Sequence, residues 1–407
     1  MATVLVAVLD AVGISTLEYL LDHHTGGVVF PHLSQLGLGT LLDQRHRARF
    51  GSWDERSHAV RLLQASASAD SVIGHREMVG VVDERTYELF PNGFSPAFIS
   101  ALEGRIGRKT IFNKQAGGSD AIRFNMEEHA RTGHPIVYAS KCDPLIQIAM
   151  DEAVIPVSEQ HRIGDVALTL ATDMGVRINR VIVRAFVRKP GGEFQRTANR
   201  HDAVLPLDSR TLVDILRGRG VWTVSVGKIS DLVNTTYDEK IKLTDPLALD
   251  PTLGLRFVHP KRKDTNPFVT QGVINALHGV SAADRPNGTL IFANFVDTDS
   301  LTGHDRDIEG TLNCVAEFDR VLPLFVRMLY HGDLLLITAD HGMEHKNDYG
   351  YHSKEPVPLL AMRVGFGKNL GGLVTGGGEG LTEVGNLVAQ VFYCADEYKD
   401  SITHIKS

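Results

Sequence analysis

The chain is poor in cysteine and in long apolar runs. Its three cysteines among 407 residues are Cys142, Cys314 and Cys394, and they form no CxxC pair. The sequence therefore predicts free thiols, and it indicates neither a disulfide framework nor a zinc knuckle. No apolar run approaches the roughly 18 to 20 residues that a membrane-spanning helix needs, so no membrane partner is expected.

The chain also lacks an excess of positive charge. It has 42 Lys and Arg residues against 49 Asp and Glu, a formal charge of -7 with neutral histidines. Affinity for a nucleic-acid backbone comes mainly from clustered Lys and Arg, so no nucleic-acid partner is expected. Residues 1–10 are apolar but have no basic n-region and no clear small-residue cleavage site, which predicts a buried strand and a cytoplasmic protein.

Five short apolar runs predict strands that are buried on both faces of a mostly parallel sheet. They are residues 4–9, 220–227, 290–296, 334–338 and 357–361. Helices are predicted between them at residues 17–21, 308–330 and 383–392, the second of these bent or divided near Pro323. The predicted fold class is α/β, with a sheet that uses both ends of the chain and is flanked by helices.

The middle of the chain predicts a second, smaller α/β domain inserted into the first. Helices are expected near residues 96–106 and 163–174, and strands near 136–139 and 181–187, with a turn at residues 189–192 joining two extended runs. The predicted boundaries are 1–89 for the first part of the core domain, 90–205 for the inserted domain and 206–407 for the second part of the core. The Gly-rich residues 376–378 favour a turn over a phosphate cradle, because no helix with a Lys follows.

Acidic residues follow three of the predicted strands. Asp10 ends the first run, Asp297 and Asp299 follow the third, and Asp340 follows the fourth. An isolated Asp after a strand is commonly a helix cap or turn former. Ligand sites of parallel sheets, however, lie at the carboxyl ends of the strands. Three acidic strand ends together therefore favour a functional cluster.

Histidines accompany these carboxylates. His304 follows Asp299, His341 is adjacent to Asp340, and His352 lies shortly after. A lone His is usually a satisfied surface or core residue, but a mixed set of Asp and His at strand ends is typical of a divalent metal site. Carboxylate and imidazole ligands together favour Mn²⁺ or Zn²⁺ over Ca²⁺, and leave Mg²⁺ open.

A serine lies in a further segment, residues 69–80 (ADSVIGHREMVG), at a turn into a predicted helix. Ser71 has two interpretations. Its hydroxyl could be the N-cap, with Gly74 and His75 in the first helical turn. It could instead be a nucleophile, if a bound metal lowers its pKa and the helix N-terminus stabilises the phosphate that it receives. The metal-binding pattern favours the nucleophile.

These segments together resemble the phosphopentomutase family, two-metal members of the alkaline phosphatase superfamily. The resemblance covers nearly the whole chain, in order and spacing. The matching segments are residues 9–14 (LDAVGI), 71–77 (SVIGHRE), 90–94 (FPNGF), 196–202 (RTANRHD), 227–231 (GKISD), 297–307 (DTDSLTGHDRD), 338–342 (TADHG) and His352. The resemblance implies an alkaline-phosphatase-like core, carrying nucleophile and metal site, with an inserted α/β cap domain that binds substrate.

The family pattern implies two divalent metal ions, with Mn²⁺ preferred and Mg²⁺ or Zn²⁺ as alternatives. Carried over to this sequence, one ion is bound by Asp299, His304 and His352, and the other by Asp10, Asp340 and His341, with Ser71 bridging the pair. Ser71 is then the residue that carries the phosphate, a task that Thr usually performs in the family.

The implied reaction interconverts ribose or deoxyribose 1-phosphate and 5-phosphate. It proceeds through a phosphoserine enzyme and a 1,5-bisphosphate, so a sugar bisphosphate serves as primer. Asp143 is expected to face the sugar hydroxyls from the cap, and Arg196, Arg200 and Lys228 are candidates for holding the non-reacting phosphate. The alternative for the two arginines is ordinary salt bridging within the cap. The partner is a small sugar phosphate, and the oligomeric state stays open, a monomer included.

The chain departs from the family pattern around the nucleophile. Ser68 and Ala69 stand where Gly and Lys are usual, Arg76 replaces the usual Trp, and residues 343–345 (MEH) replace the commoner Asn-Asp. The first change removes a cation near the reacting phosphate. Three alternatives to a pentose mutase therefore stay open: a metal-dependent phosphoester hydrolase of the same superfamily, a mutase paralogue for another sugar phosphate, and a non-catalytic binding protein.

Overall fold

The structure is a computed structural model of the chain. It describes residues 2–24, 26, 30–50, 57–141, 143–197, 199–205, 207, 209–243, 248–259, 264–282, 285–346 and 349–406. The chain divides into two compact units, a core unit of Met1–Arg85 with Leu207–Ser407, and an inserted unit of Thr86–Pro206. Cys142 lies outside the described residues, whereas Cys314 and Cys394 are buried free thiols.

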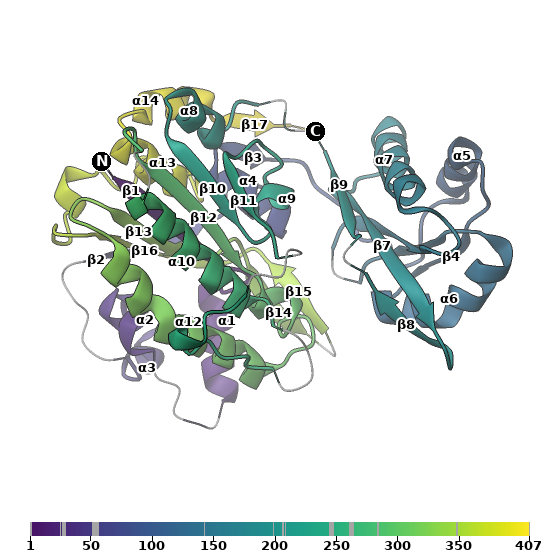
Figure 1. The fold of residues 1–407 in the computed structure, drawn as a ribbon, viewed down its shortest axis with the longest axis horizontal. Helices are drawn as coiled ribbons and strands as arrows, with labels where there is room; N and C mark the ends of the chain where they lie inside the picture. The colour runs from purple at the N-terminus through teal and green to yellow at the C-terminus, as the bar shows by residue number, and fades with distance from the viewer. Residues whose placement is uncertain are drawn as a thin grey trace. The chain divides into compact units, whose positions relative to one another are not determined.

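The core unit is built on a seven-stranded sheet of order β11-β10-β12-β1-β13-β16-β2 (Figure 1). The strands are β1 (Thr3–Leu9), β2 (Ser57–Leu63), β10 (Trp222–Val226), β11 (Glu239–Ile241), β12 (Thr289–Phe295), β13 (Leu334–Thr338) and β16 (Pro356–Arg363). The first five strands in the order are parallel, β16 is antiparallel to both of its neighbours, β13 and β2, and β2 therefore runs in the same direction as the first five. The predicted mostly parallel sheet is thus confirmed, with its last apolar run reversed in direction.

Helices cover both faces of this sheet, as the continuous apolar runs predict. On β12, the ring of Phe295 packs at 4.8 Å from Phe318 of α12 (Ile308–Met328), beside α10 (Asn266–Ala282). Phe292 has the opposite parity on the strand and meets α4 (Ser71–Met78), α8 (Leu212–Gly218) and α13 (Thr382–Val391). Opposite side-chain parity places the two helix groups on opposite faces. α12 runs through Pro323 as one helix and is not divided there.

Shorter elements complete the core unit. They are α1 (Ile14–His23), α2 (Pro31–Gln35), η1 (Leu38–Leu41), α3 (Gln44–Arg47), α9 (Ile229–Leu232), η2 (Pro251–Leu253), α11 (Asp297–Ser300), η3 (Leu370–Gly372), α14 (Ala395–Ser401), the antiparallel pair β14 (Gly342–Lys346) and β15 (Tyr349–Ser353), and the parallel pair β3 (Val81–Asp83) and β17 (Thr403–Ile405). In the Gly-rich loop, the N–H groups of Gly376 and Gly378 donate to the carboxylate of Glu383, which supports its interpretation as a turn.

The inserted unit has a sheet of order β4-β5-β6-β7-β8, with β9 also paired to β7. Its elements are β4 (Ile111–Gln115), β5 (Ile136–Ala139), β6 (Leu145–Asp151), β7 (Arg180–Lys189), β8 (Glu193–Arg196), β9 (His201–Val204), α5 (Pro96–Ile106), α6 (Gly118–Thr132) and α7 (Val157–Asp173). Two apolar clusters, one with α5 and α7 and one with α6, fill opposite faces of this sheet. The predicted turn near residues 189–192 joins β7 and β8 as an antiparallel hairpin.

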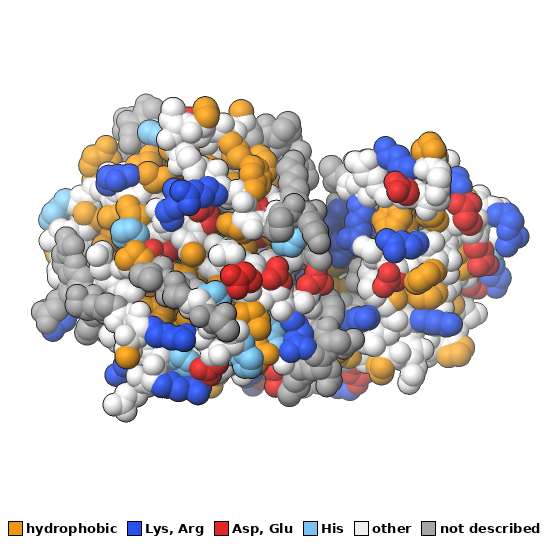
Figure 2. All heavy atoms as spheres, turned by 90° about the horizontal axis from the view of Figure 1, so that it is seen from below, with side chains coloured by type: hydrophobic (Ala, Val, Ile, Leu, Met, Phe, Trp, Pro, Cys, Tyr) orange, Lys and Arg blue, Asp and Glu red, His pale blue; other side chains and the backbone are white. Residues whose placement is uncertain are grey.

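The surface carries both signs of charge. On the face shown in Figure 2, the described basic and acidic side chains are interspersed in both units. That distribution differs from the continuous basic stripe that is typical of nucleic-acid binders. No helix among the described residues is long and apolar enough to cross a bilayer.

Candidate active site

The carboxyl edge of the core sheet gathers the acidic residues and histidines. The strands β12, β1 and β13 are neighbours, and each is followed by an acidic residue, so these side chains converge. Two groups have ligand atoms within 4.8 Å of one another. They are Asp10, Asp340 and His341, and Asp299, His341 and His352. His341 belongs to both groups, so the two sets are contiguous.

Asp10 is held by its neighbours on both sides of β1. Its Oδ2 accepts a hydrogen bond from Asn294 Nδ2 at 2.9 Å, and the N–H of Ala11 donates to Asp340 Oδ1 at 3.1 Å. Ala11 has φ +62°, in the left-handed region that disfavours a residue with a Cβ. Strain of this kind concentrates at functional sites. The turn after β1 thus bends sharply at the point where it presents Asp10.

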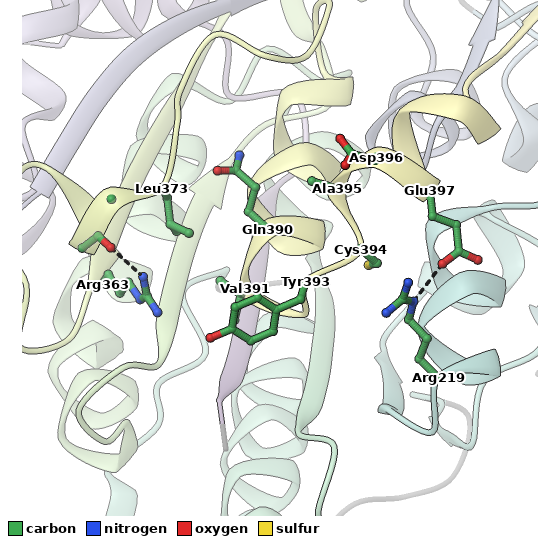
Figure 3. Close-up of a pocket in the computed structure, with 12 residues that line it drawn as sticks. Arg219, Arg363, Leu373, Gln390, Val391, Tyr393, Cys394, Ala395, Asp396 and Glu397 are labelled. Atoms are coloured by element: carbon green, nitrogen blue, oxygen red, sulfur yellow. Dashed lines mark hydrogen bonds and ion pairs between the residues drawn. The ribbon is translucent and has the colours of Figure 1, made fainter.

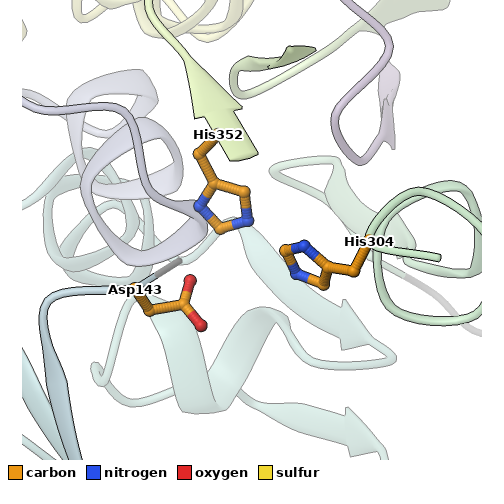
Figure 4. A group of neighbouring side chains, drawn as sticks. All are labelled: Asp143, His304 and His352. Atoms are coloured by element: carbon orange, nitrogen blue, oxygen red, sulfur yellow. The ribbon is translucent and has the colours of Figure 1, made fainter. Parts of the chain in front are cut away.

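Three further side chains meet beside this group. The Oδ1 of Asp299 lies 3.1 Å from His352 Nε2 and 3.4 Å from His304 Nε2. The imidazoles of His304 and His352 stack with centroids 5.1 Å apart (Figure 4), and His352 lies 4.1 Å from the ring of His341. His352 lies on β15, which pairs antiparallel with β14, the strand that directly follows His341. Asp143, also drawn in Figure 4, belongs to the inserted unit.

Ser71 lies among these ligands at the start of α4. Its hydroxyl is 3.2 Å from Asp10 Oδ1 and 3.3 Å from His341 Nε2. The N-cap of the helix is Asp70, whose side chain accepts the N–H of Val72 at 2.8 Å. The N-cap interpretation of Ser71 is therefore wrong. Because Asp70 caps the helix, the Ser71 hydroxyl is left for the acidic cluster.

The electrostatics of the cluster fit a divalent cation. Burial, together with the nearby charges of Asp340 and Asp299, raises the pKa of Asp10 well above its usual value. Burial also opposes the charged forms of Asp299 and Asp340, but the adjacent histidines hold the pKa of each below its usual value. Burial lowers the pKa of His341, which favours the neutral imidazole that binds metals. Closely spaced buried carboxylates with neutral imidazoles form a donor set for Mn²⁺ or Zn²⁺.

Asp297, the remaining acidic residue after β12, has a different role. Its carboxylate accepts the N–H groups of Thr265 and Asn266 at 2.7 and 2.6 Å, where α10 begins. Burial raises the pKa of Asp297. Asp297 does not cap the helix that follows it, since it is the first residue of α11, but its carboxylate satisfies N–H groups at the start of α10, which is a structural role.

Lys228 is the one predicted substrate ligand in the core unit. It precedes α9, just beyond the carboxyl end of β10, and its charge lowers the pKa of Asp10, in opposition to burial and to the charges of Asp340 and Asp299. A cavity of about 600 Å³ lies elsewhere in this unit. Tyr393 lies between Arg219 and Arg363 there (Figure 3). Arg363 pairs with Leu334, the first residue of β13, so this cavity is at the amino edge of the sheet, opposite the acidic cluster.

The inserted unit contains the other predicted substrate ligands. Asp143 Oδ2 accepts a hydrogen bond from Ser140 Oγ at 3.1 Å, and its Oδ1 lies 4.0 Å from Arg180 Nη2. Arg196 donates to Ser119 Oγ at 3.2 Å. Arg200 pairs with both carboxylate oxygens of Asp202 at 2.5 Å, which is the salt bridge that the alternative interpretation anticipates.

Sequence reasoning missed two arginines on β7. Arg180, Ile182 and Arg184 lie on the same face of the strand. Arg184 Nε donates to Gln147 Oε1 at 2.9 Å. Strand periodicity was the available signal, because residues at i, i+2 and i+4 point to one face. This face of β7 therefore adds two cationic side chains to those of the 196–202 segment.

Sequence reasoning also missed two polar residues behind the acidic cluster. His75 is fully buried within α4, and Asn294 is fully buried within β12. The signal for Asn294 was a single amide in the otherwise apolar run 290–296. Buried polar groups are usually retained with a partner, and Asn294 bonds both Asp10 and His75.

The fold and this cluster define a metal-dependent α/β enzyme. The family model for the Metalloenzyme superfamily matches residues 2–394. A phosphopentomutase of Dictyoglomus thermophilum is 34% identical over 90% of this chain and 89% of its own. One of Caldanaerobacter subterraneus subsp. tengcongensis is 33% identical over 88% and 84%. The chain belongs to the phosphopentomutase family and is an isomerase of the phosphotransferase type, as the sequence motifs predict.

Two solved structures that align with this chain have TM-scores below 0.5. Phosphoglycerate mutase of Leishmania mexicana covers 96% of this chain and 95% of its own, with a TM-score of 0.44 and 12% identity. Alkaline phosphatase of the Antarctic bacterium TAB5 covers 96% and 98%, with a TM-score of 0.38 and 11% identity. The α/β fold class rests on the observed sheet and on the superfamily match, and both confirm the prediction.

Proposed function

We propose that this chain interconverts pentose 1-phosphate and pentose 5-phosphate, with Ser71 as the phosphate carrier. The observation that carries the proposal is the position of the Ser71 hydroxyl, within 3.3 Å of both a buried carboxylate and a buried imidazole. The relatives named phosphopentomutase supply the substrate class. A ribose or deoxyribose phosphate and a 1,5-bisphosphate primer are therefore the reactants.

Two divalent metal ions belong to the proposal, with Mn²⁺ as the preferred ion. Asp10, Asp340 and His341 would hold one ion, and Asp299, His304 and His352 the other, with Ser71 between them. The donor set supports this, because it combines carboxylates with imidazoles and brings the carboxylates of Asp10, Asp340 and Asp299 close enough for their charges to raise the pKa of Asp10. When bound, such ions lower the pKa of a ligated hydroxyl and neutralise charge on phosphoryl oxygens.

The chain's own residues position the phosphoryl group. Phospho-Ser71 donates its phosphoryl to the free hydroxyl of the sugar phosphate, so one P–O bond to Ser71 breaks and one to the sugar forms. The resulting 1,5-bisphosphate returns its other phosphate to Ser71, so one P–O bond to the sugar breaks and one to Ser71 forms. The proton of the Ser71 hydroxyl passes to the sugar oxygen that is released. The N-terminus of α4 favours the anionic phosphate, since its helix dipole is positive at that end.

Substrate binding is assigned to the inserted unit and to Lys228. Asp143 would accept hydrogen bonds from the sugar hydroxyls, and Arg196 would hold the non-reacting phosphate with Arg180 and Arg184. Arg200 is the weaker candidate, because Asp202 already engages its guanidinium in a bidentate pair. Guanidinium groups suit the task, since their planar fork matches two phosphate oxygens. The inserted unit would also exclude water, which separates a mutase from a phosphatase.

The test is ³¹P NMR of Mn²⁺-loaded protein with α-ribose 1-phosphate and a trace of sugar bisphosphate. Ribose 5-phosphate without inorganic phosphate is the expected product. Ser71→Ala should abolish conversion and retain Mn²⁺ binding, whereas the matched control Ser34→Ala, a buried serine of α2, should convert normally. Accumulating inorganic phosphate would favour a hydrolase, and an unchanged spectrum would contradict the pentose substrate. Normal conversion by Ser71→Ala would overturn the nucleophile assignment.

A further inference from the structure

We propose that His75 and Asn294 act as positioning residues, which together fix the two carboxylates of the group formed by Asp10, Asp340 and His341. This inference deepens the proposed function and rests on its metal site. It assigns a role to two buried polar side chains that the proposed reaction does not use directly.

A chain of contacts links the two carboxylates through the interior of the core unit. Asn294 Nδ2 lies 2.9 Å from Asp10 Oδ2 and 2.9 Å from His75 Nε2. On the other side of the ring, His75 Nδ1 lies 2.7 Å from the carbonyl oxygen of Ser71 and 3.3 Å from Asp340 Oδ2. The connection therefore runs from Asp10 to Asp340 and also touches the backbone of the nucleophile.

The contacts specify which atoms donate. In the ionised form that binds a metal, Asp10 Oδ2 can only accept, so the amide of Asn294 presents its NH₂ group there, and the second hydrogen of that group is directed to His75 Nε2. His75 Nε2 is then the acceptor, and Nδ1 donates its hydrogen to the carbonyl oxygen of Ser71, with Asp340 Oδ2 in electrostatic contact at 3.3 Å. A flipped amide would set Asn294 Oδ1 against the Asp10 carboxylate. The four groups thus form one consistent sequence of donors and acceptors.

The burial of these groups argues for a functional reason. His75 and Asn294 are both 0% exposed, and Asn294 Oδ1 accepts no hydrogen bond within the described part of the chain. An amide that is half satisfied in an apolar strand costs stability relative to an apolar residue. It is retained here at a position of β12 from which the side chain reaches Asp10. Groups that orient metal ligands from behind are common, and their loss weakens metal binding.

The experiment measures Mn²⁺ affinity and turnover separately. Metal-free wild type, His75→Ala and Asn294→Ala are titrated with Mn²⁺, and free Mn²⁺ is followed by electron paramagnetic resonance. Each substitution is expected to weaken binding about 10-fold to 100-fold, the usual range for such partners. Turnover is expected to recover as the Mn²⁺ concentration is raised, because the substitutions act through the metal ligands and leave Ser71 in place. His75→Gln, which can both donate and accept, should lie closer to wild type.

The matched control is His129→Ala in the inserted unit. His129 is also fully buried, with Nδ1 bonded to His134 O at 2.7 Å and Nε2 accepting the N–H of Asp151 at 2.9 Å. Its loss should lower the melting temperature but leave Mn²⁺ affinity unchanged. A general effect of removing a buried imidazole is thereby separated from an effect on the metal group.

A double-variant cycle tests whether the two residues act as one bridge. His75→Ala with Asn294→Ala should weaken Mn²⁺ binding little more than either single change, because each already interrupts the connection. If both single variants bind Mn²⁺ as wild type does while Asp340→Asn binds weakly, this inference fails and the proposed metal site stands. If Asp340→Asn also binds Mn²⁺ as wild type does, the proposed metal site itself fails.

Discussion

At the scale of single residues, the role of Ser71 depends on which side chain, that of Asp70 or that of Ser71, accepts the free N–H groups at the start of α4. A serine and an aspartate are both favoured N-caps, and residues 70 and 71 offer one of each. In the structure Asp70 accepts the N–H of Val72, and Ser71 becomes the first helical residue. The hydroxyl is consequently directed at Asp10 and His341 instead of its own backbone. One residue of difference in the cap position separates a structural serine from a candidate nucleophile.

The arginines of the inserted unit differ in how far their guanidinium groups are already engaged. Arg196→Ala is expected to raise KM about 10-fold to 100-fold with a smaller effect on kcat, because a charge-assisted contact to a non-reacting phosphate contributes mainly to binding. Steady-state kinetics with ribose 1-phosphate measure this. The control Arg105→Ala removes an exposed arginine paired with Asp173 and should leave both constants unchanged. An unchanged KM in Arg196→Ala would remove this residue from the substrate site.

The pH dependence of stability should contain a contribution from Asp319 of α12. Burial raises the pKa of Asp319 to about 6, although its carboxylate accepts the N–H of Leu33 at 2.7 Å. The folded chain therefore holds this proton more tightly than the unfolded chain, whose Asp residues titrate near 4. The stability from this group is complete below about pH 4 and is lost as the pH rises through about 6.

Asp319→Asn removes this titration and keeps an acceptor for Leu33. Between pH 4 and pH 7, the free energy of unfolding of the variant should rise relative to that of wild type by up to about 3 kcal/mol. This value corresponds to a difference of about two pKa units between the folded and unfolded wild-type chain. Urea unfolding at several pH values measures the difference. A constant difference across this range would show that Asp319 keeps the same pKa in the folded and unfolded chains.

At the scale of elements, α4 is held tightly against the strand ends. Its Glu77 is fully buried and accepts the N–H groups of Ala65, Ser66 and Leu381 at 2.7 to 2.8 Å, which fixes the helix between two loops. Its Gly74 faces the backbone of Asp340 so closely that a Cβ there would overlap the carbonyl oxygen. The absence of a side chain at Gly74 thus allows α4, which carries Ser71, to approach Asp340 closely.

Gly74→Ala should push α4 away from Asp340. We expect a loss of about 1 to 3 kcal/mol in the free energy of unfolding, the usual range for overpacking, and a fall in turnover of at least about 10-fold, since displaced catalytic groups lose productive geometry. Gly104→Ala in α5 is the matched control. A Cβ at Gly104 would meet nothing within 4 Å, so alanine should stabilise that helix by about 0.5 to 1 kcal/mol. Thermal unfolding and kinetics of both variants decide whether close approach is the cause.

At the scale of the whole molecule, each unit has an apolar core of its own. The largest cluster consists of core-unit residues, and the two smaller clusters consist of residues between Phe90 and Leu205. A chain segment that buries its own apolar side chains on both faces of a sheet meets the condition for independent folding.

The segment 86–206, expressed alone, should fold cooperatively. Its apolar clusters need no residue of the core unit, so circular dichroism should show a single urea transition and helix content from α5, α6 and α7. It should not bind Mn²⁺, because the proposed ligands lie in the core unit. A gradual, non-cooperative loss of signal would mean that this unit depends on the core for its structure.

The sequence by itself determined the α/β class, the buried strands and the acidic residues that follow them, because those features depend on local patterns of apolar and turn-forming residues. Only the tertiary structure decided the antiparallel direction of β16 and the contacts that connect Asp10 to Asp340 through Asn294 and His75. These depend on contacts between residues that are far apart along the chain. No local pattern of residues encodes these contacts, since the segments that make them come together only when the sheet has formed.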